Sequence, residues 1–367
     1  MKKRIHGPSL YYATDKNVFD ALNQHKVDTP TVMKLFQRRN IIVSKKTPRE
    51  DLAKYFARLT HDYYDHKDIA ARLGIAPRRE RITSMDVAGV GEIEKLQASV
   101  EQLKQELESA GDVIQVSRNG DSLTMHVQYS TVDYNLNEFA QVQVRDGAVE
   151  FVKSPEGYIV RNTQNDYLNG VRETLLGKIE KATDTPLTKV VVSLFDVPSP
   201  KLRSKFFHEL VNSLPGYVRD DVTEVYVYKA KPDIDDDEVD SSIASDPDTH
   251  VERVFLRGNG VTRSELLNEL LDEEDYYITK IGWTATETMG VGNVYDIEAV
   301  FADPKDCTGF SFILSGVFPF EEGKVSGRRR APLAAEIDAI SRVIESKSRE
   351  LVAKFRAEFA VASAGVT

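Results

Sequence analysis

The sequence has few of the features that mark membrane, secreted or zinc-binding proteins. Its 367 residues include one cysteine, Cys307, which can form no internal disulfide and cannot supply the thiolates of a structural zinc site. No apolar run approaches the roughly 18 residues of a membrane span. The basic start of the chain is followed by Pro8 and polar residues instead of the apolar stretch of a signal peptide. We therefore expect a cytoplasmic protein with no membrane partner.

Known catalytic motifs are also missing. The sequence has no Gly-x-Ser-x-Gly elbow and no His-Glu-x-x-His pair, and Cys307 has no adjacent histidine. We expect no catalytic residues, no metal and no cofactor, although the lack of a familiar motif leaves a novel enzyme open. Hydrophobic residues make up 41% of the chain and charged residues 29%, as in ordinary folded proteins. At roughly 100–200 residues per domain, the length allows two or three domains.

The charge is unevenly distributed along the chain. The net charge is −10, yet residues 1–81 hold 18 Lys and Arg against 9 Asp and Glu, and the excess of acidic residues lies in the remainder. Basic segments favour phosphate backbones, and an acidic body keeps the rest of a molecule off nucleic acid. The alternative is a basic segment that docks on the acidic body of its own chain.

Patterns of apolar and turn residues predict an α+β protein in six parts. These are a small basic helical module (1–75), a linker and connector helix (76–111), a first α/β part (112–230), an acidic loop (231–250), a second α/β part (251–330) and a long C-terminal helix (331–367). Residues 188–229 and 251–301 each have the order strand, capped helix, strand, which suggests duplicated modules. Residues 119–121 and 145–147 are predicted hairpin turns.

Helix-start signals frame the basic module. Asp28 before Thr29 and Pro30 predicts a helix to about residue 39. Thr47 and Glu50 have the spacing of a capping box around Pro48, which predicts a second helix. The β-branched residues 41–43 between the two helices favour an extended stretch.

This helix, extended stretch and helix, residues 30–59, resembles the SAP and helix-extension-helix class of small DNA-binding modules. That class has an apolar helix, an extended turn with a glycine and a small polar residue, and a second helix that opens with a basic residue and a leucine. Residues 33–36, 39–44 and 47–52 take these places here. Asn40 stands where the class usually has glycine, and asparagine tolerates the left-handed conformation better than most residues. The resemblance covers about thirty residues and implies backbone-dominated contacts with duplex DNA.

The residues expected to contact nucleic acid belong to this module and its flanks. Lys45, Lys46 and Arg49 cluster at a helix N-terminus, where free N–H groups and the helix dipole favour a phosphate. The full predicted set is Arg38, Arg39, Ser44, Lys45, Lys46, Thr47, Arg49, Arg78, Arg79 and Arg81. The alternative is a helical hairpin with solvated lysines.

Two histidines invite a metal-site interpretation. His61 and His66 lie five residues apart among Asp62 and Asp65, so on a helix they point about 140° from each other. A His–Asp pair at i,i+4 supplies only part of a ligand set. We therefore expect no metal site there.

The predicted C-terminal helix carries one long apolar stripe. It consists of Leu333, Ile337, Ile340, Ile344, Leu351, Phe355 and Phe359. Such a stripe must be covered by the α/β body or by another chain, because monomers rarely expose large apolar patches. We expect self-association or a protein partner through this helix.

Together these features favour a non-enzymatic adaptor that anchors to duplex DNA and recruits or assembles protein partners, possible settings being prokaryotic DNA maintenance or antiphage defence. One alternative is a nuclease or nucleotide-acting enzyme with an unrecognised active site in the α/β body. Another is a structural protein that oligomerises through its helices. Salt-dependent DNA binding and metal-dependent cleavage separate the three hypotheses.

Overall fold

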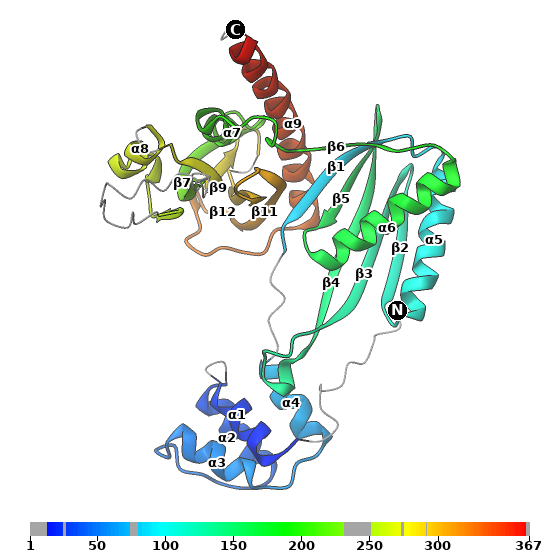
Figure 1. The fold of residues 1–367 in the computed structure, drawn as a ribbon. Helices are drawn as coiled ribbons and strands as arrows, with labels where there is room; N and C mark the ends of the chain where they lie inside the picture. The colour runs from blue at the N-terminus through cyan, green and yellow to red at the C-terminus, as the bar shows by residue number, and fades with distance from the viewer. Residues whose placement is uncertain are drawn as a thin grey trace, which may run out of the picture. The chain divides into compact units, whose positions relative to one another are not determined.

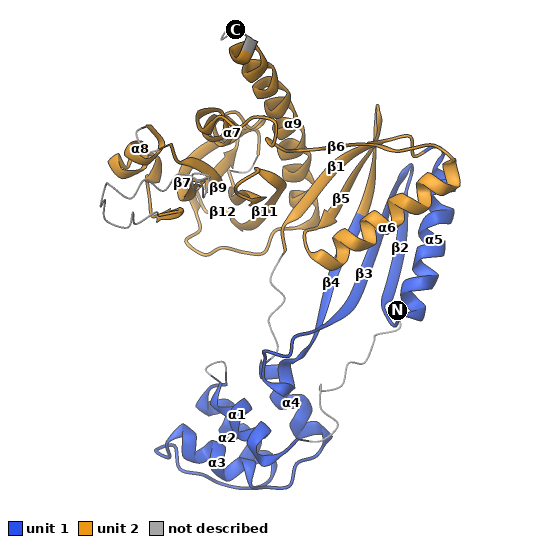
Figure 2. Ribbon diagram, in the orientation of Figure 1, with its two compact units in different colours: residues 1–78, 91–149 blue, residues 79–90, 150–367 orange. Residues whose placement is uncertain are grey.

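The α+β class is confirmed. The computed structural model describes residues 13–24, 27–73, 80–230, 251–272, 275–290 and 292–364. The chain divides into two compact units, shown in Figure 2: unit 1 comprises residues 1–78 and 91–149, and unit 2 comprises residues 79–90 and 150–367. The predicted acidic loop, residues 231–250, lies outside the described residues. None of the helices in the described ranges is long and apolar enough to cross a bilayer.

Unit 1 begins with four short helices that pack together (Figure 1): α1 (Asp15–Asn23), α2 (Thr29–Arg38), α3 (Arg49–Ala57) and α4 (Tyr63–Leu73). We call residues 13–73 the helical module. The Asp28 side chain caps α2 by accepting from the backbone N–H of Thr31, as predicted. The core of the module is formed mainly by apolar residues of all four helices, among them Leu22, Leu35, Phe36, Leu52, Phe56 and Ile69.

The rest of unit 1 consists of a helix and a strand hairpin. Helix α5 (Ile93–Ser109) contacts β2 (Val113–Asn119), which pairs antiparallel with β3 (Ser122–Val132) through the predicted turn at Gly120. The short helix η1 (Glu138–Ala140) follows β3 and places Phe139 in the core of the helical module. The predicted turn at residues 145–147 is wrong, because β4 (Val142–Ser154) continues through it as one strand.

Strand β1 (Ile82–Ala88) lies inside the stretch that the sequence predicts as a linker. Its burial alternates, with Thr83, Met85 and Val87 buried. It pairs antiparallel with β5 (Gly157–Thr163) along most of its length. The alternation was obscured because the buried set includes a threonine and the strand follows an arginine-rich run.

Unit 2 is built on an antiparallel sheet. The strand order is β5, β1, β11 (Thr308–Phe318), β10 (Val294–Asp303), β9 (Tyr277–Glu287), β7 (Tyr217–Tyr228) and β8 (Arg253–Arg257). Strand β6 (Thr188–Val191) also pairs with β1, and β12 (Phe320–Glu321) pairs with β13 (Lys324–Val325). The predicted strand, helix, strand order occurs twice, but the pairing differs: β6 joins β1, whereas β8 joins β7.

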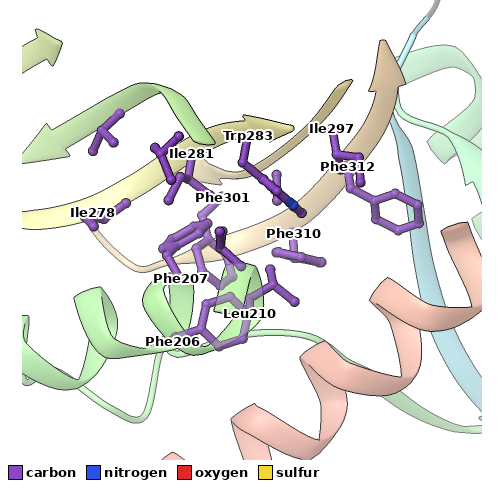
Figure 3. Packing of buried hydrophobic residues seen from close by; sticks show 14 of the residues in the cluster. Phe206, Phe207, Leu210, Ile278, Ile281, Trp283, Ile297, Phe301, Phe310 and Phe312 are labelled. Atoms are coloured by element: carbon purple, nitrogen blue, oxygen red, sulfur yellow. The ribbon is translucent and has the colours of Figure 1, made fainter. Parts of the chain in front are cut away.

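Helices of unit 2 bury apolar side chains against this sheet. They are α6 (Asp166–Thr183), α7 (Pro200–Asn212), η2 (Val261–Arg263), α8 (Glu265–Asp272) and α9 (Ala334–Ala364). Figure 3 shows aromatic rings of α7 beside rings of β10 and β11, where Phe206 lies 5.5 Å from Phe301 and 5.7 Å from Phe310 between ring centroids. Such aromatic contacts add to the stabilisation that burial provides.

Most of the predicted apolar stripe is covered by unit 2 itself, whereas Leu333 precedes α9 and is 61% exposed. Ile340, Ile344, Leu351 and Phe355 are buried in the same cluster as the α7 aromatics. The structure therefore does not leave the uncovered apolar face from which the sequence predicted an association between chains.

Candidate nucleic-acid interface

The loop between α2 and α3 has the predicted extended form. Asn40 takes the left-handed conformation at φ +58°, which the sequence anticipated for this turn. Beyond it, Ile41 and Val43 pack against the core of the helical module, whereas the side chain of Ile42 between them is 95% exposed. The alternation fixes the loop to the module and leaves one large apolar side chain in solvent.

Ser44 shapes the turn that carries the two lysines. Its side-chain oxygen accepts from the backbone N–H of Lys46 at 3.2 Å, and its carbonyl oxygen accepts from the N–H of Thr47 at 3.1 Å. Lys45 and Lys46 are exposed in this turn. Since the Ser44 hydroxyl oxygen already accepts a backbone hydrogen bond, the lysines are the residues of the turn best suited to reach a phosphate.

The predicted capping box at the start of α3 is wrong. Pro48 occupies the N-cap position, and no described side chain caps this helix. Glu50 pairs with Lys54 one turn further on, at 2.7 Å, instead of reaching back to Thr47. Backbone N–H groups of the first turn are therefore uncapped directly after the two lysines. The acidic Glu50 and Asp51 in the same turn oppose an anion there.

Two of the predicted arginines are engaged within the helical module. Arg38 forms an ion pair with Asp68, and Arg39 forms one with Asp65, both partners lying on α4. These pairs connect the end of α2 to α4. They leave the two guanidinium groups less available for DNA than the sequence suggested.

Arg49 also has an internal role. Its Nε and Nη2 atoms donate to the carbonyl oxygen of Leu22, at 3.1 and 2.8 Å, and Nη2 also donates to the carbonyl oxygen of Gln24. These carbonyls lie at the end of α1, where the last C=O groups of a helix have no N–H partner within the helix. Arg49 therefore ties α3 to α1.

Arg81 belongs to unit 2 and pairs there with Glu298 of β10. Burial disfavours the charge of Glu298, but hydrogen bonds from Lys280 and Arg81 outweigh it and lower the pKa of this carboxyl. Arg78 and Arg79 lie outside the described residues. Thr47 of the predicted set is half-buried. Among the described cations of that set, Lys45 and Lys46 are thus the ones whose side chains are not engaged elsewhere in the chain.

Sequence reasoning missed two exposed apolar groups of this region. Ile42 was assigned only to an extended stretch, and Tyr55 falls in the predicted second helix, at helical spacing from Leu52. Leu52 and Phe56 are buried, whereas Tyr55 is exposed. Because consecutive helical residues differ by about 100°, Tyr55 lies opposite the centre of the face that Leu52, Ala53, Phe56 and Ala57 bury. That spacing was the available signal.

Within the described ranges, no group of three or more His, Cys, Asp or Glu side chains is arranged to hold a metal ion. Comparisons with known proteins do not assign the interface either. No protein-family model matches the chain, and no curated protein is significantly similar to it.

Proposed function

We propose that the chain is a non-enzymatic adaptor that binds duplex DNA through the loop between α2 and α3. One observation carries the proposal: Lys45 and Lys46 are exposed in a turn that leads directly into the uncapped first turn of α3. Free backbone N–H groups beside two ammonium groups favour a phosphate, and together they outweigh the opposing charges of Glu50 and Asp51 in the same turn. The excess of basic residues in positions 1–81 supports the same partner.

The contacts available at this loop set the character of the binding. Two lysines neutralise few phosphates, so the affinity is modest and its dependence on salt is shallow, because the slope grows with the number of neutralised phosphates. Phosphate contacts position a protein on the duplex but carry no direct sequence information. We therefore expect little sequence preference. The acidic remainder of the chain avoids DNA and is the part that contacts protein partners in the cytoplasm.

The test is a titration of the full chain with a fluorescent duplex at several salt concentrations. For the wild type, the logarithm of the affinity falls linearly with the logarithm of the salt concentration, by about 0.9 per neutralised phosphate. The double variant Lys45→Gln/Lys46→Gln loses affinity, and its slope is smaller by roughly two such contacts.

A matched control keeps the change in net charge the same. Lys205 and Lys354 of unit 2 pair with Glu358 and Glu209 on the protein surface. Lys205→Gln/Lys354→Gln should bind DNA as the wild type does. An unchanged slope in the Lys45/Lys46 variant would reject the loop as the interface, and metal-dependent cleavage of the duplex would favour the nuclease alternative.

A further inference from the structure

A second polar feature of the helical module lies beside the ion pairs of α2 and α4. It is a hollow of about 560 Å³ lined by Arg38, Arg39, Thr60, His61, Asp62, Tyr64 and Asp65. Its residues come from the end of α2, the connection between α3 and α4, and the first turn of α4. The hollow is separate in sequence from the loop that carries Lys45 and Lys46.

The wall of this hollow contains buried polar atoms without a partner. The side chain of His61 is only 7% exposed, and neither of its ring nitrogens has a hydrogen-bond partner. The Nε atom of Arg39 is also buried and unpartnered. Buried polar groups cost free energy unless they are hydrogen-bonded, so these atoms require a ligand or ordered water.

The two unpartnered groups are neighbours. The guanidinium carbon of Arg39 lies 5.5 Å from the ring centroid of Phe56, and the ring of His61 lies 5.0 Å from the same centroid. Asp65 connects them further, because it pairs with Arg39 and its Oδ2 lies 3.7 Å from Nδ1 of His61. A ligand that reaches one of these groups therefore lies close to the other.

The carboxylates of the hollow are already in use as acceptors. Asp65 accepts from Arg39, and Asp62 accepts from the backbone N–H of Asp65 at 2.9 Å. The latter hydrogen bond lowers the pKa of Asp62. The atoms left over include N–H donors, from the Arg39 Nε and from the imidazole. A neutral imidazole keeps one acceptor nitrogen beside its N–H, so the missing partner supplies acceptor oxygens for the N–H groups and can offer an O–H to that nitrogen.

We propose that this hollow binds a phosphate monoester, and that on a nucleic acid this is the terminal phosphate of a strand. The second part rests on the proposed function. Phosphate oxygens accept strong hydrogen bonds from guanidinium and imidazole N–H groups. A terminal phosphate protrudes and can reach the buried His61, whereas an internal phosphodiester is flanked by sugars on both sides. The lining contains two arginines and two carboxylates, so their charges balance. Hydrogen-bond donors, and not a net positive charge, therefore determine which ligand binds.

Two measurements on the full chain test this site. The first compares duplexes that are identical except for a 5′-phosphate or a 5′-hydroxyl, and the phosphorylated duplex should bind about tenfold more tightly, as expected for hydrogen bonds to a charged group. The second is a calorimetric titration of the wild type with inorganic phosphate. His61→Phe keeps a ring against Phe56 but removes both nitrogens, and should abolish both effects. His126→Phe, a change at an exposed position of β3, is the matched control and should preserve them.

The outcomes separate the sources of the phosphate and the two proposals. Binding of inorganic phosphate that is lost in His61→Phe supports the site, and a preference for the phosphorylated duplex identifies the strand end as its source. Binding of inorganic phosphate without that preference supports the site for a free phosphate monoester and overturns the strand-end assignment. No heat with inorganic phosphate and equal affinity for both duplexes overturns the site, which then holds water.

If the chain binds no duplex at all, the proposed function fails while the phosphate titration still decides the site. If His61→Phe does not fold, the same titration of Lys45→Gln/Lys46→Gln decides, because heat that persists without these lysines supports the hollow and heat that disappears with them overturns it.

Discussion

Arg161 of β5 and Glu345 of α9 form a buried ion pair through two hydrogen bonds. Nε of Arg161 lies 2.7 Å from Oε1 of Glu345, and Nη2 lies 2.8 Å from Oε2. Their side chains are 4% and 0% exposed. Nη1 of the same arginine donates to Asp338, about two helical turns earlier on α9, at 2.7 Å. The arrangement fixes the rotation and register of α9 against β5, because a bidentate pair requires one geometry.

Removal of one partner of this pair should destabilise unit 2 strongly. Glu345→Gln leaves the charge of Arg161 buried with reduced compensation, and breaking a buried ion pair costs roughly 3–5 kcal/mol. Glu350→Gln is the control on the same helix, since Glu350 is exposed and pairs with Lys347 of the same helix. Urea unfolding of both variants measures the difference. Equal free energies of unfolding would show that the pair does not hold α9.

A charge in the apolar stripe of α9 should unfold the chain and not merely separate two copies. Ile344 is fully buried in the unit 2 core, so Ile344→Asp places a carboxylate among apolar side chains at a cost of several kcal/mol. Val361, near the end of the same helix, is 75% exposed, and Val361→Asp should leave the stability unchanged. Circular dichroism reports the folding and light scattering the mass. A folded Ile344→Asp variant with a lower mass would instead support association through this helix.

Two threonines at helix starts should respond differently to the same substitution. Thr14 caps α1 through a capping box with Asn17, so Thr14→Ala should cost about 1 kcal/mol. Thr47 caps nothing, because Pro48 holds the N-cap position of α3. Thr47→Ala should therefore change the free energy of unfolding by less than about 0.5 kcal/mol. Thermal unfolding of the two variants provides the comparison. An equal loss of stability in both variants would show that Thr47 caps α3, as the sequence predicted.

Arg49 should affect stability more than DNA binding. Its guanidinium group serves the carbonyl oxygens of Leu22 and Gln24 together, and the single ammonium group of lysine cannot repeat that geometry. Arg49→Lys should cost about 1–3 kcal/mol of stability, as expected for charged hydrogen bonds, here to the half-buried carbonyl of Leu22 and the exposed carbonyl of Gln24. Its affinity for duplex DNA, measured where the variant is folded, should match the wild type. An affinity for DNA that is weaker and less dependent on salt than that of the wild type would show that Arg49 contacts DNA.

The helical module should lose stability in mild acid. Burial and the neighbouring His61 lower the pKa of His66 below its ordinary value, against the opposing effect of Asp65 and Asp62. The unfolded chain therefore binds a proton at His66 more readily than the folded chain does. Stability is full at neutral pH and falls as the pH decreases through the ordinary imidazole range near 6.5. In urea unfolding at pH 5 and 7.5, His66→Phe should reduce the pH dependence, whereas His126→Phe should preserve it.

The sequence predicted local structure well because the signals for it are local. Asp28 and the residues after it carry the complete information for a helix start, and Asn40 alone marks a left-handed turn. The heptad-like spacing of Ile340, Ile344 and Leu351 likewise predicted a long amphipathic helix. What covers that helix is a tertiary property, and periodicity cannot distinguish a body of the same chain from a second chain.

The candidate site was predicted less accurately for the same reason. A run of arginines indicates positive charge, but whether that charge is free depends on partners far along the chain. Arg39 finds Asp65 at a separation of 26 residues, and Arg81 finds Glu298 at a separation of 217. Lys45 and Lys46 stayed open because their turn projects from the module, which no count of charges reveals.

The buried thiol of Cys307 makes the chain convenient for site-specific labelling. Burial raises its pKa to about 12, and thiol reagents react with the exposed thiolate. The native protein should therefore take up almost no maleimide while it is folded. A cysteine introduced at an exposed loop position such as Ile42 would be the one reactive thiol, so a dye could report on the α2–α3 loop without removal of the natural cysteine.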